Sequence, residues 1–367
     1  MPEEIIKTKN ICNLCGKPLI KKGEKTAEIK AFPAMKTIYH KRCWLKTKKE
    51  EEINCLIFMS CRSIGDTISI TPCIREFKRI YPKINLDIVT TIPEVFKYNT
   101  NLRKVIPYNK DMKQAFLQTY DASWQPFQPD NKNFPLHMLT HSVDFVSYGM
   151  FRKFLKPQHK HYEINYTYIE ANNCENICKH NNIYLKKDKI LLIHPNSSEW
   201  KTRTWKTENW QKLVNLIQRD HPDYKLVSVG GDRDIIKEIK TQKMDNHVVL
   251  DNCIDMYNKL SLLETIHLMN NSKMLISMDT GAIHIAGATD IHIFGIFTVV
   301  NSQYRLPYFK GELGYNCTAI DSEECDCCYD QKILTEILDI NECPKKYDEL
   351  KCHPSVNRVW DKLTRLL

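Results

Sequence analysis

The apolar residues of this chain fall into short unbroken runs that are separated by polar turns. Such a pattern is typical of buried parallel strands that alternate with helices. Uncharged runs at 53–59 and 190–195 each open a stretch of this kind. Helical spacing of apolar residues follows over 66–81 and 209–219. Shorter runs predict further strands at 86–89, 105–107, 224–229, 274–278 and 291–295. The pattern predicts an α/β protein with two Rossmann-like halves that face one cleft.

The length of the chain and its changes in pattern suggest a division into parts. At about 150 residues per domain, 367 residues correspond to two domains with room for a small module. We expect a module at 1–52, a first half at 53–168, and a second half at 185–352. A closing helix is expected at 353–367. The segment 108–168 is rich in aromatic residues and receives no assignment.

The composition narrows the class of partner and the compartment. A net charge of +9 favours an anionic partner, which includes nucleotides, phosphorylated glycans, nucleic acids and acidic membrane surfaces. No apolar stretch reaches the ~18 residues that span a bilayer. The N-terminus is charged and lacks the apolar core of a signal peptide, so we expect a cytosolic protein. In a reducing compartment, the 15 cysteines indicate metal ligands and scattered core thiols rather than disulfides.

The first 52 residues contain two ligand pairs that suit zinc. Cys12 and Cys15 form one pair, and His40 and Cys43 form the other. The two members of each pair are separated by two residues, which lets one tight turn supply two ligands of a tetrahedral site. Since the segment is too small for a full core, a structural zinc ion would supply its folding energy. Unrelated thiols are the alternative. Its many Lys and Arg residues suit either nucleic-acid contact or a solvated surface.

Two polar blocks follow predicted strands and lead into predicted helices. The first contains Ser63, Gly65 and Asp66, and the second runs from Asp279 to His284. A carboxylate at a strand end can accept a proton from an attacking hydroxyl, although an Asp there can also serve as a helix N-cap. Glycine permits close approach of the backbone, and the amides of a first helical turn can bind phosphate. His284 is either part of that site or a packed helix histidine.

A third polar segment follows the strand that ends at Pro195. It supplies hydroxyl groups and cations directly after a strand end, which suits a diphosphate. Its candidate donor-binding residues are Ser197, Ser198, Lys201 and Arg203.

These blocks together resemble glycosyltransferase family 9, the heptosyltransferases of lipopolysaccharide core assembly. The similarity covers about residues 53–365 and rests on several matching segments. The matching segments are Ser63-Ile64-Gly65-Asp66, His194-Pro195, Arg203-Thr204-Trp205, Gly230-Gly231 and Asp279-Thr280-Gly281-Ala282-Ile283-His284. The family has no module before its first strand, and the basic residue before Trp is usually Lys. The resemblance implies a GT-B fold, in which the closing helix at 353–367 packs back on the first half. It also implies an inverting transfer of a sugar from a nucleotide-diphosphate sugar to an acceptor hydroxyl.

The resemblance also implies roles for individual residues. Asp66 is expected to be the catalytic base, with Ser63 and Gly65 in the loop on the acceptor side. The donor is expected to contact a set from the second half, namely Ser197, Ser198, Lys201, Arg203, Asp279, Thr280, Gly281 and His284. No catalytic metal is expected, because these groups can stabilise the charge of the leaving nucleotide.

The family carries a C-terminal cysteine set that this chain matches. Its members here are Cys325, Cys328, Cys343 and Cys352. Four thiols at such spacings suit zinc or iron, and free thiols are the alternative.

The sequence leaves more than one class of acceptor possible. A lipopolysaccharide-type glycan is implied by the resemblance, whereas the basic module suits a modified base of DNA or RNA. A protein is a third acceptor. A different class of function is a nucleic-acid-binding protein on an inactive glycosyltransferase scaffold, although the presence of Asp66, Asp279 and His284 argues against it. An NAD-linked enzyme is disfavoured because neither first strand leads into a Gly-x-Gly-x-x-Gly turn.

Overall fold

The structure is a computed structural model, and it describes residues 49–60, 63–109, 112, 119–126, 140–196, 201–231, 247–323, 325, 343 and 351–367. The expected zinc ligands Cys12, Cys15, His40 and Cys43 lie outside the described residues.

The first half is built on a parallel sheet, as the apolar runs predicted. Its spatial order is β3-β2-β1-β4, and every neighbouring pair is parallel. The strands are β1 (Asn54–Met59), β2 (Asn85–Thr90), β3 (Lys104–Pro107) and β4 (Ala122–Trp124). The chain moves outward from β1 to β3 and then returns to the other side of β1 with β4. The carboxyl ends of β1 and β4 therefore mark the point where the strand order reverses.

The helical stretch predicted over 66–81 is two helices rather than one. Helix α3 (Ile64–Ser69) ends before Ile70, and α4 (Thr71–Ile80) starts directly after it. Pro72 has no N–H to donate within a continuous helix, so the ladder breaks at this position. The hydroxyl of Thr71 donates to the carbonyl of Ile68 at 2.9 Å and satisfies an acceptor at the break.

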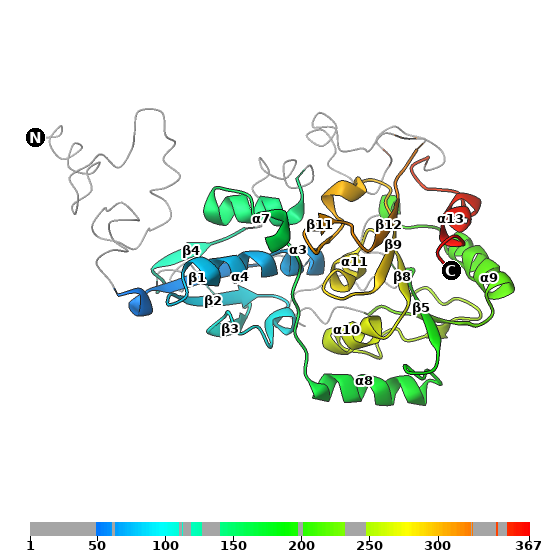
Figure 1. The fold of residues 1–367 in the computed structure, drawn as a ribbon, viewed down its shortest axis with the longest axis horizontal. Coiled ribbons are helices and arrows are strands. Elements are labelled where there is room, and N and C mark those ends of the chain that lie inside the picture. Colours follow the sequence, from blue (N-terminus) through cyan, green and yellow to red (C-terminus); the bar gives the residue numbers. More distant parts are fainter. Residues whose placement is uncertain are drawn as a thin grey trace, which may run out of the picture.

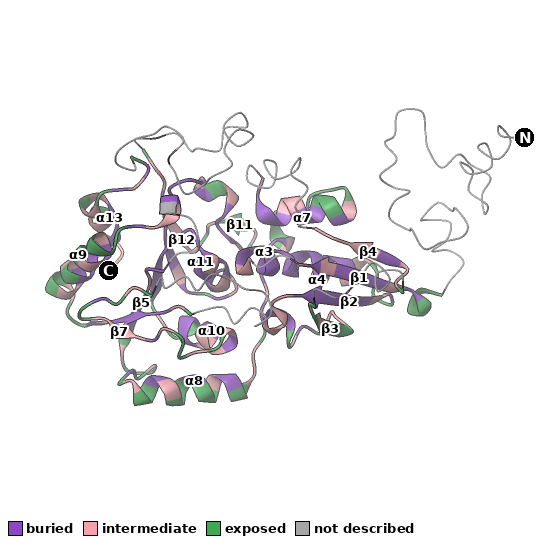
Figure 2. Ribbon diagram, turned by 180° about the vertical axis from the view of Figure 1, so that it is seen from behind, coloured by how far each residue is buried: buried purple, intermediate pink, exposed green. Residues whose placement is uncertain are grey.

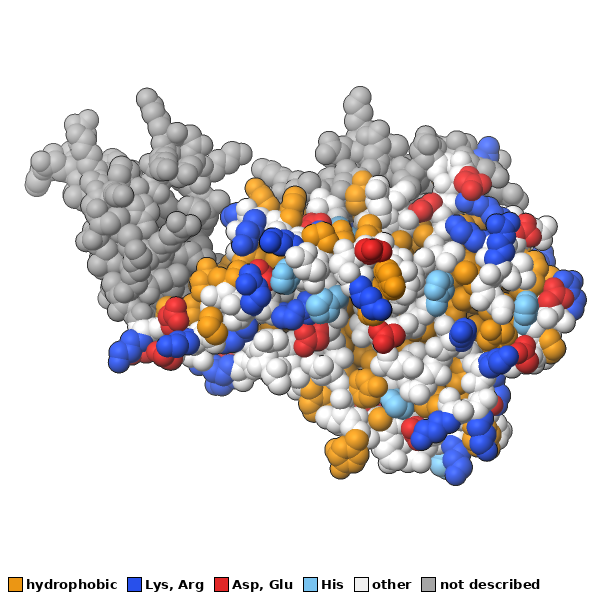
Figure 3. Space-filling view, in the orientation of Figure 1, with side chains coloured by type: hydrophobic (Ala, Val, Ile, Leu, Met, Phe, Trp, Pro, Cys, Tyr) orange, Lys and Arg blue, Asp and Glu red, His pale blue; other side chains and the backbone are white. Residues whose placement is uncertain are grey.

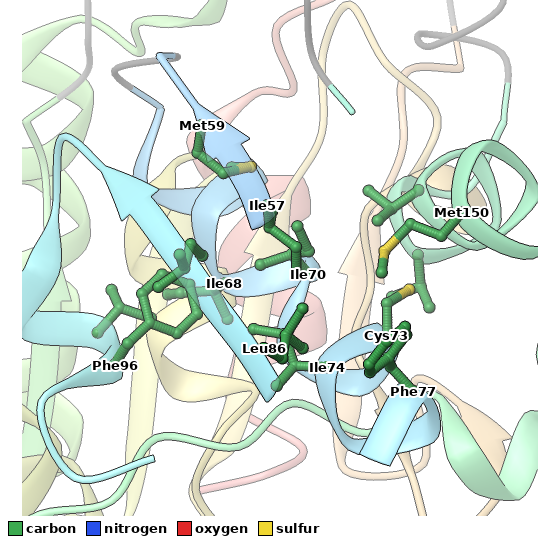
Figure 4. Packing of buried hydrophobic residues seen from close by; sticks show 14 of the residues in the cluster. Ile57, Met59, Ile68, Ile70, Cys73, Ile74, Phe77, Leu86, Phe96 and Met150 are labelled. Atoms are coloured by element: carbon green, nitrogen blue, oxygen red, sulfur yellow. The ribbon is translucent and has the colours of Figure 1, made fainter. Parts of the chain in front are cut away.

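A third helix, α7 (Ser142–Phe151), covers the same half, and it comes from the segment that received no prediction. Figure 4 shows how the core forms between these helices and the strands. Ile57 of β1 lies beside Ile70, Leu86 of β2 lies beside Ile74 of α4, and Met150 reaches the cluster from α7. Because side chains from both the sheet and the helices are buried in one cluster, α3 is packed against the sheet at its carboxyl edge.

The second half contains a larger parallel sheet. Its order is β12-β9-β8-β5-β6-β7, again parallel throughout. The strands are β5 (Lys189–His194), β6 (Tyr224–Ser228), β7 (Ile254–Asp255), β8 (Met274–Met278), β9 (His292–Ile296) and β12 (Cys317–Ile320). A small antiparallel hairpin joins β10 (Tyr308–Phe309) to β11 (Glu312–Leu313). Here the strand order reverses between β5 and β8, which confirms the prediction of two parallel α/β halves.

Helices cover both faces of this sheet (Figure 1). They are α8 (Tyr168–His180), α9 (Thr207–Asp220), α10 (Leu262–Asn270), α11 (Gly281–Ala286) and α13 (Val356–Leu363). Helix α8, which was not predicted, lies beside α10 and keeps an exposed outer side in Figure 2. Its start is fixed by a capping box between Thr167 and Glu170.

The closing helix does not pack as expected. Val359 and Leu363 of α13 are fully buried in the same cluster as Leu213 and Ile217 of α9, so α13 packs on the second half rather than the first. Its apolar residues recur every three or four positions, and the stripe they form needs an apolar partner. The apolar side of α9, with Leu213 and Ile217, supplies that partner.

The two halves touch through side chains of both. Leu263 and Ile266 of α10 are buried in the core cluster of the first half. The carboxylate of Glu94 accepts a hydrogen bond from the backbone N–H of Leu263 at 3.4 Å. Across the junction, a ring nitrogen of His141 lies 3.0 Å from the carbonyl oxygen of Leu306. These contacts define a junction at which the carboxyl edges of the two sheets approach each other (Figure 1).

Among the described residues, we find no helix that is both long and apolar enough to cross a membrane.

Candidate functional site

Helix α3 carries Asp66 to the carboxyl edge of the first sheet. Ser63 is the N-cap of this helix, and its hydroxyl accepts a hydrogen bond from the backbone N–H of Asp66 at 3.3 Å. Asp66 is therefore in the first turn, and the N-cap role that the sequence left open for it belongs to Ser63. The side chain of Asp66 is half-buried. With the backbone N–H already capped, the carboxylate is not needed to start the helix.

The second block occupies the corresponding edge of the second sheet. Asp279 directly follows β8, and Thr280 is the N-cap of α11, with its hydroxyl accepting from the N–H of Ala282 at 3.3 Å. The same hydroxyl lies 3.3 Å from Nδ1 of His194 at the end of β5. The block thus spans β5 and β8, the two strands between which the order of the sheet reverses. Ligands of open α/β sheets bind at such points.

The tertiary structure brings the two blocks into direct contact. Gly65 of α3 packs against the imidazole of His284 of α11. A Cβ atom added to Gly65 would lie 2.6 Å from Cδ2 and 2.9 Å from Nε2 of that ring. Only a residue without a side chain permits this approach. Two segments more than 200 positions apart in the chain therefore form one site at the junction of the halves.

Arg203 is held by the second block. Its Nη2 lies 2.7 Å from Oδ2 of Asp279, and it also donates to the backbone carbonyl of Asp279. The contact with Oδ2 is an ion pair by distance, but its alignment is too poor for a hydrogen bond. Asp279 is 3% exposed, and within the described residues its Oδ1 has no hydrogen-bond partner. Part of the charge of Arg203 is thus compensated inside the protein before any ligand binds.

His284 is buried among charged and polar groups from several elements. The hydroxyl of Tyr162 lies 3.1 Å from Nδ1 of the imidazole. Burial lowers the pKa of His284 to about 4, and the guanidinium groups of Arg305 and Arg203 act in the same direction. The carboxylates of Asp279 and Asp66 oppose this lowering of the pKa. The imidazole is therefore neutral near pH 7, so it hydrogen-bonds without adding charge.

Three buried residues of this site were not predicted from the sequence. Tyr162 lies in the connection between the halves, Arg305 follows β9 and a short turn, and His141 precedes α7. All three interact electrostatically with one another or with His284. Of the three, only Arg305 could have been predicted from the sequence, because it is a cation that follows the predicted strand at 291–295. Tyr162 and His141 come from the aromatic segment that shows no periodic pattern.

Several predicted residues lie outside what the structure describes. Ser197 and Ser198 are among them, as is the side chain of Lys201, so the predicted diphosphate loop is not tested. Cys328 is outside as well. Cys325 and Cys352 are buried and Cys343 is half-buried. In the described portion of the chain, no three His, Cys, Asp or Glu side chains form a group that could hold a metal ion.

Charge on the described surface is mixed. On the face drawn in Figure 3, Lys and Arg side chains are dispersed among acidic and apolar ones rather than gathered in one patch. This face alone therefore offers no continuous basic track of the kind that follows a nucleic-acid backbone.

Comparison with known proteins gives both a family match and a fold. Residues 150–332 match the model of glycosyltransferase family 9 (heptosyltransferase). No curated protein matches the chain. Among solved structures, a family 9 glycosyl transferase from Veillonella parvula DSM 2008 is similar with a TM-score of 0.63 at 14% identity, covering 87% of this chain and 98% of that one.

Two enzymes from E. coli are also similar. The iron-containing dodecameric glycosyltransferase TibC from enterotoxigenic E. coli H10407 has a TM-score of 0.59 at 16% identity, covering 87% of this chain and 78% of its own. ADP-heptose lps heptosyltransferase II from E. coli has a TM-score of 0.52 at 12% identity, covering 85% of this chain and 98% of its own. At these identities the likeness is one of fold. The fold and the family match together support an enzyme of the glycosyltransferase class.

Proposed function

We propose that this chain, a glycosyltransferase with a family 9 domain, moves a sugar from a nucleotide-diphosphate sugar to a hydroxyl of an anionic acceptor, with inversion at the anomeric carbon. The contact between Gly65 and His284 is the observation that carries the proposal. Because of this contact, the carboxylate-bearing turn of the first half and the Asp279–His284 block of the second half are close enough to act on one pair of substrates.

The donor is assigned to the second half. The reversal of strand order between β5 and β8 supports this, as do the first-turn amides at Thr280 and Gly281. Ser197, Ser198, Lys201 and Arg203 are proposed to contact the diphosphate, and Asp279 orients Arg203 through their ion pair. TibC has been described in complex with ADP-D-β-D-heptose. An ADP-sugar, with ADP-heptose first, is therefore the donor that we propose to test before others.

The acceptor hydroxyl is activated by Asp66 in this proposal. As the hydroxyl oxygen forms its bond to the anomeric carbon, its proton passes to the carboxylate of Asp66. The bond from the anomeric carbon to the diphosphate oxygen breaks, and its electron pair leaves with the nucleotide. Attack on the face opposite the leaving group inverts the configuration.

The leaving nucleotide gains negative charge that must be stabilised. Arg203 and Arg305 both interact electrostatically with His284, so both cations are near the junction. Arg305 is buried, so its charge is less screened by water than that of a surface residue. We propose that these two guanidinium groups, with the neutral imidazole of His284, stabilise the departing diphosphate.

The acceptor is proposed to be an anionic glycan of the lipopolysaccharide type. The net charge of +9 supports an anionic acceptor in general. A modified base of DNA or RNA carries the same sign of charge, and a protein acceptor is the remaining choice. An acceptor screen with oligonucleotides, phosphorylated glycans and proteins separates these classes.

The cysteine sets are proposed to be structural metal sites. Cys12, Cys15, His40 and Cys43 would hold zinc, and the C-terminal set would hold zinc or iron. Support comes from the chemistry of the thiol and imidazole donors and from the burial of Cys325 and Cys352. No step of the transfer passes through either metal.

The base assignment is tested with Asp66→Asn, which keeps the size of the side chain and removes its basicity. Nucleotide sugars are first screened by thermal shift, and the best donor is incubated with candidate acceptors and analysed by mass spectrometry. We expect kcat to fall by about 100-fold or more in Asp66→Asn, with the affinity for the donor retained. Asp290→Asn, at an exposed turn of the second half, is the matched control. Full activity of Asp66→Asn would overturn the mechanism.

A further inference from the structure

We infer that Tyr162 is a positioning residue, which holds His284 in the tautomer that carries its proton on Nε2, so that the imidazole donates a hydrogen bond at the junction of the two halves. This inference rests on the proposed function for its role in transfer, but the tautomer itself can be measured without any transfer.

Tyr162 is buried and packed against His284, so its hydroxyl is held close to the imidazole. Tyr162 lies between η4 (Pro157–His159) and α8, in the connection from the first half to the second, and is 4% exposed. Its ring centroid lies 5.7 Å from that of His284. The end of α11 accommodates the tyrosine ring because residue 287 is glycine: a Cβ there would come within 2.9 Å of Cδ2 of Tyr162.

The direction of the hydrogen bond between Tyr162 and His284 follows from the lack of another acceptor for the tyrosine hydroxyl. The hydroxyl oxygen of Tyr162 and Nδ1 of His284 are 3.1 Å apart, and either could be the donor by geometry. Among the described residues, the hydroxyl of Tyr162 has no hydrogen-bond partner other than His284. If Nδ1–H donated, the phenol proton would be buried without an acceptor, which is unfavourable. The hydroxyl therefore donates and Nδ1 accepts.

The ionisation of both groups is compatible with this direction. Burial raises the pKa of Tyr162, so the hydroxyl keeps its proton near neutral pH. Burial also lowers the pKa of His284, so the ring carries a single proton. With Nδ1 used as acceptor, that proton is on Nε2.

The Nε2 atom faces the other half of the site. It is the atom that would lie 2.9 Å from a Cβ on Gly65, in the helix that carries Asp66. Charged groups that act on the imidazole come from four elements besides its own: Asp66 of α3, Asp279 after β8, Arg203 of η5 (Lys201–Arg203) and Arg305 after η6 (Ser302–Tyr304). Within the described residues, Nε2 has no hydrogen-bond partner. An N–H at this atom can donate to an oxygen of the leaving diphosphate, whereas the other tautomer would present a lone pair and repel it.

The chain provides a matched control for removal of the hydroxyl. Tyr166 is a second tyrosine of the same connection, and its hydroxyl lies 3.3 Å from Nδ1 of another histidine, His267 of α10. Tyr162→Phe and Tyr166→Phe each remove one hydroxyl that contacts a histidine, but only the first affects His284. Phenylalanine keeps the ring in both, which is buried at Tyr162 and half-buried at Tyr166, so the packing is retained.

The tautomer is measured by ¹⁵N spectroscopy of the full chain labelled at histidine, with the His284 signals identified by their loss in His284→Asn. In the wild type we expect an unprotonated Nδ1 and a protonated Nε2 for His284. In Tyr162→Phe we expect both nitrogens to shift toward a mixture of tautomers, and in Tyr166→Phe we expect no change at His284. A proton on Nδ1 in the wild type, or His284 signals unaffected by Tyr162→Phe, would overturn the inference.

The effect on transfer is measured as ADP release from ADP-heptose, with the same three proteins. We expect Tyr162→Phe to lower kcat about tenfold with less than a twofold change in KM, and Tyr166→Phe to leave both unchanged. An unchanged kcat in Tyr162→Phe would overturn the positioning role. If the wild type releases no ADP while the tautomer pattern holds, the proposed donor fails and the assignment of the proton to Nε2 stands.

Discussion

Gly65 and His284 are in van der Waals contact across the junction of the two halves, although 218 positions separate them in the chain. The glycine leaves room for the imidazole, since a Cβ at residue 65 would lie 2.6 Å from Cδ2 of the ring. The contact explains why the turn that bears Asp66 and the helix that follows Asp279 can serve one reaction. It also identifies the position at which the smallest possible change should disturb the site.

Gly65→Ala is expected to lower both stability and activity. The added methyl group must displace the buried ring of His284, and such overpacking costs about 1–3 kcal/mol. The free energy of unfolding from urea titration and the kcat of transfer are the measurements.

Gly149→Ala in α7 is the control for Gly65→Ala, because a Cβ at Gly149 meets nothing within 4 Å. There we expect a gain in stability of roughly 0.5–1 kcal/mol, since alanine is the better helix former. Equal effects of the two substitutions would contradict the contact between Gly65 and His284.

Asp279→Asn is expected to destabilise the protein by about 3 kcal/mol, because it removes the carboxylate charge that pairs with the guanidinium of Arg203 at 2.7 Å in a largely buried position. Arg203→Lys should also weaken donor binding, since an ammonium group cannot reproduce the planar contacts of the guanidinium. Unfolding titrations and donor titrations followed by thermal shift measure the two effects.

Asp223→Asn provides the comparison for Asp279→Asn. Asp223 pairs with Lys189 at 2.6 Å, but both side chains are more than half exposed. A surface pair of this kind contributes little, so we expect a change near zero. A similar loss at both sites would show that burial of the Asp279 pair has no energetic consequence.

Stability is expected to fall as the pH is lowered from 7.5 to 5. The pKa of His284 is about 4 in the folded protein and near 6.5 when the chain is unfolded, so the unfolded state takes up the proton first. The stability that the neutral imidazole contributes is complete above pH 6.5 and is lost as the pH falls toward 4. His284 alone accounts for a loss of about 2 kcal/mol between pH 7.5 and 5.

Urea titrations at several pH values measure this dependence. His141, whose pKa burial lowers to about 3, acts in the same direction, so wild type must be compared with His284→Asn. The variant should lose less stability than the wild type over this range. Parallel curves for the two proteins would mean that His284 is protonated equally in the folded and unfolded states.

The purified full chain is expected to contain zinc, and zinc or iron in a second site, when analysed by mass spectrometry of the metals. Cys352→Ser should remove the metal of the C-terminal set, and Cys12→Ser that of the N-terminal set. Cys253→Ser, a half-buried thiol outside both sets, should change neither. A metal-free protein with intact activity would leave the cysteines as ordinary thiols.

Elements with a strong local pattern were predicted well, and elements without one were missed. The strand at 274–278 coincides with β8, and the runs that opened each half became β1 and β5. Helix α7 and strand β4 lie in the aromatic segment, where packing rather than periodicity decides the structure. The break between α3 and α4 was missed because the apolar residues keep a helical spacing across it. Pro72 was the one local sign of the break.

Local patterns in the chain were enough to predict the class of fold and both polar blocks, because strand runs, helix caps and turn residues act over short distances in the chain. The three-dimensional arrangement was needed to see that Gly65 faces His284, that the Tyr162 hydroxyl contacts Nδ1 of His284, and that Arg203 pairs with Asp279. It also decided that α13 packs on α9 and not on the first half. These relationships join residues from separate elements, and they depend on how two sheets are oriented and buried against each other. No local pattern records that orientation.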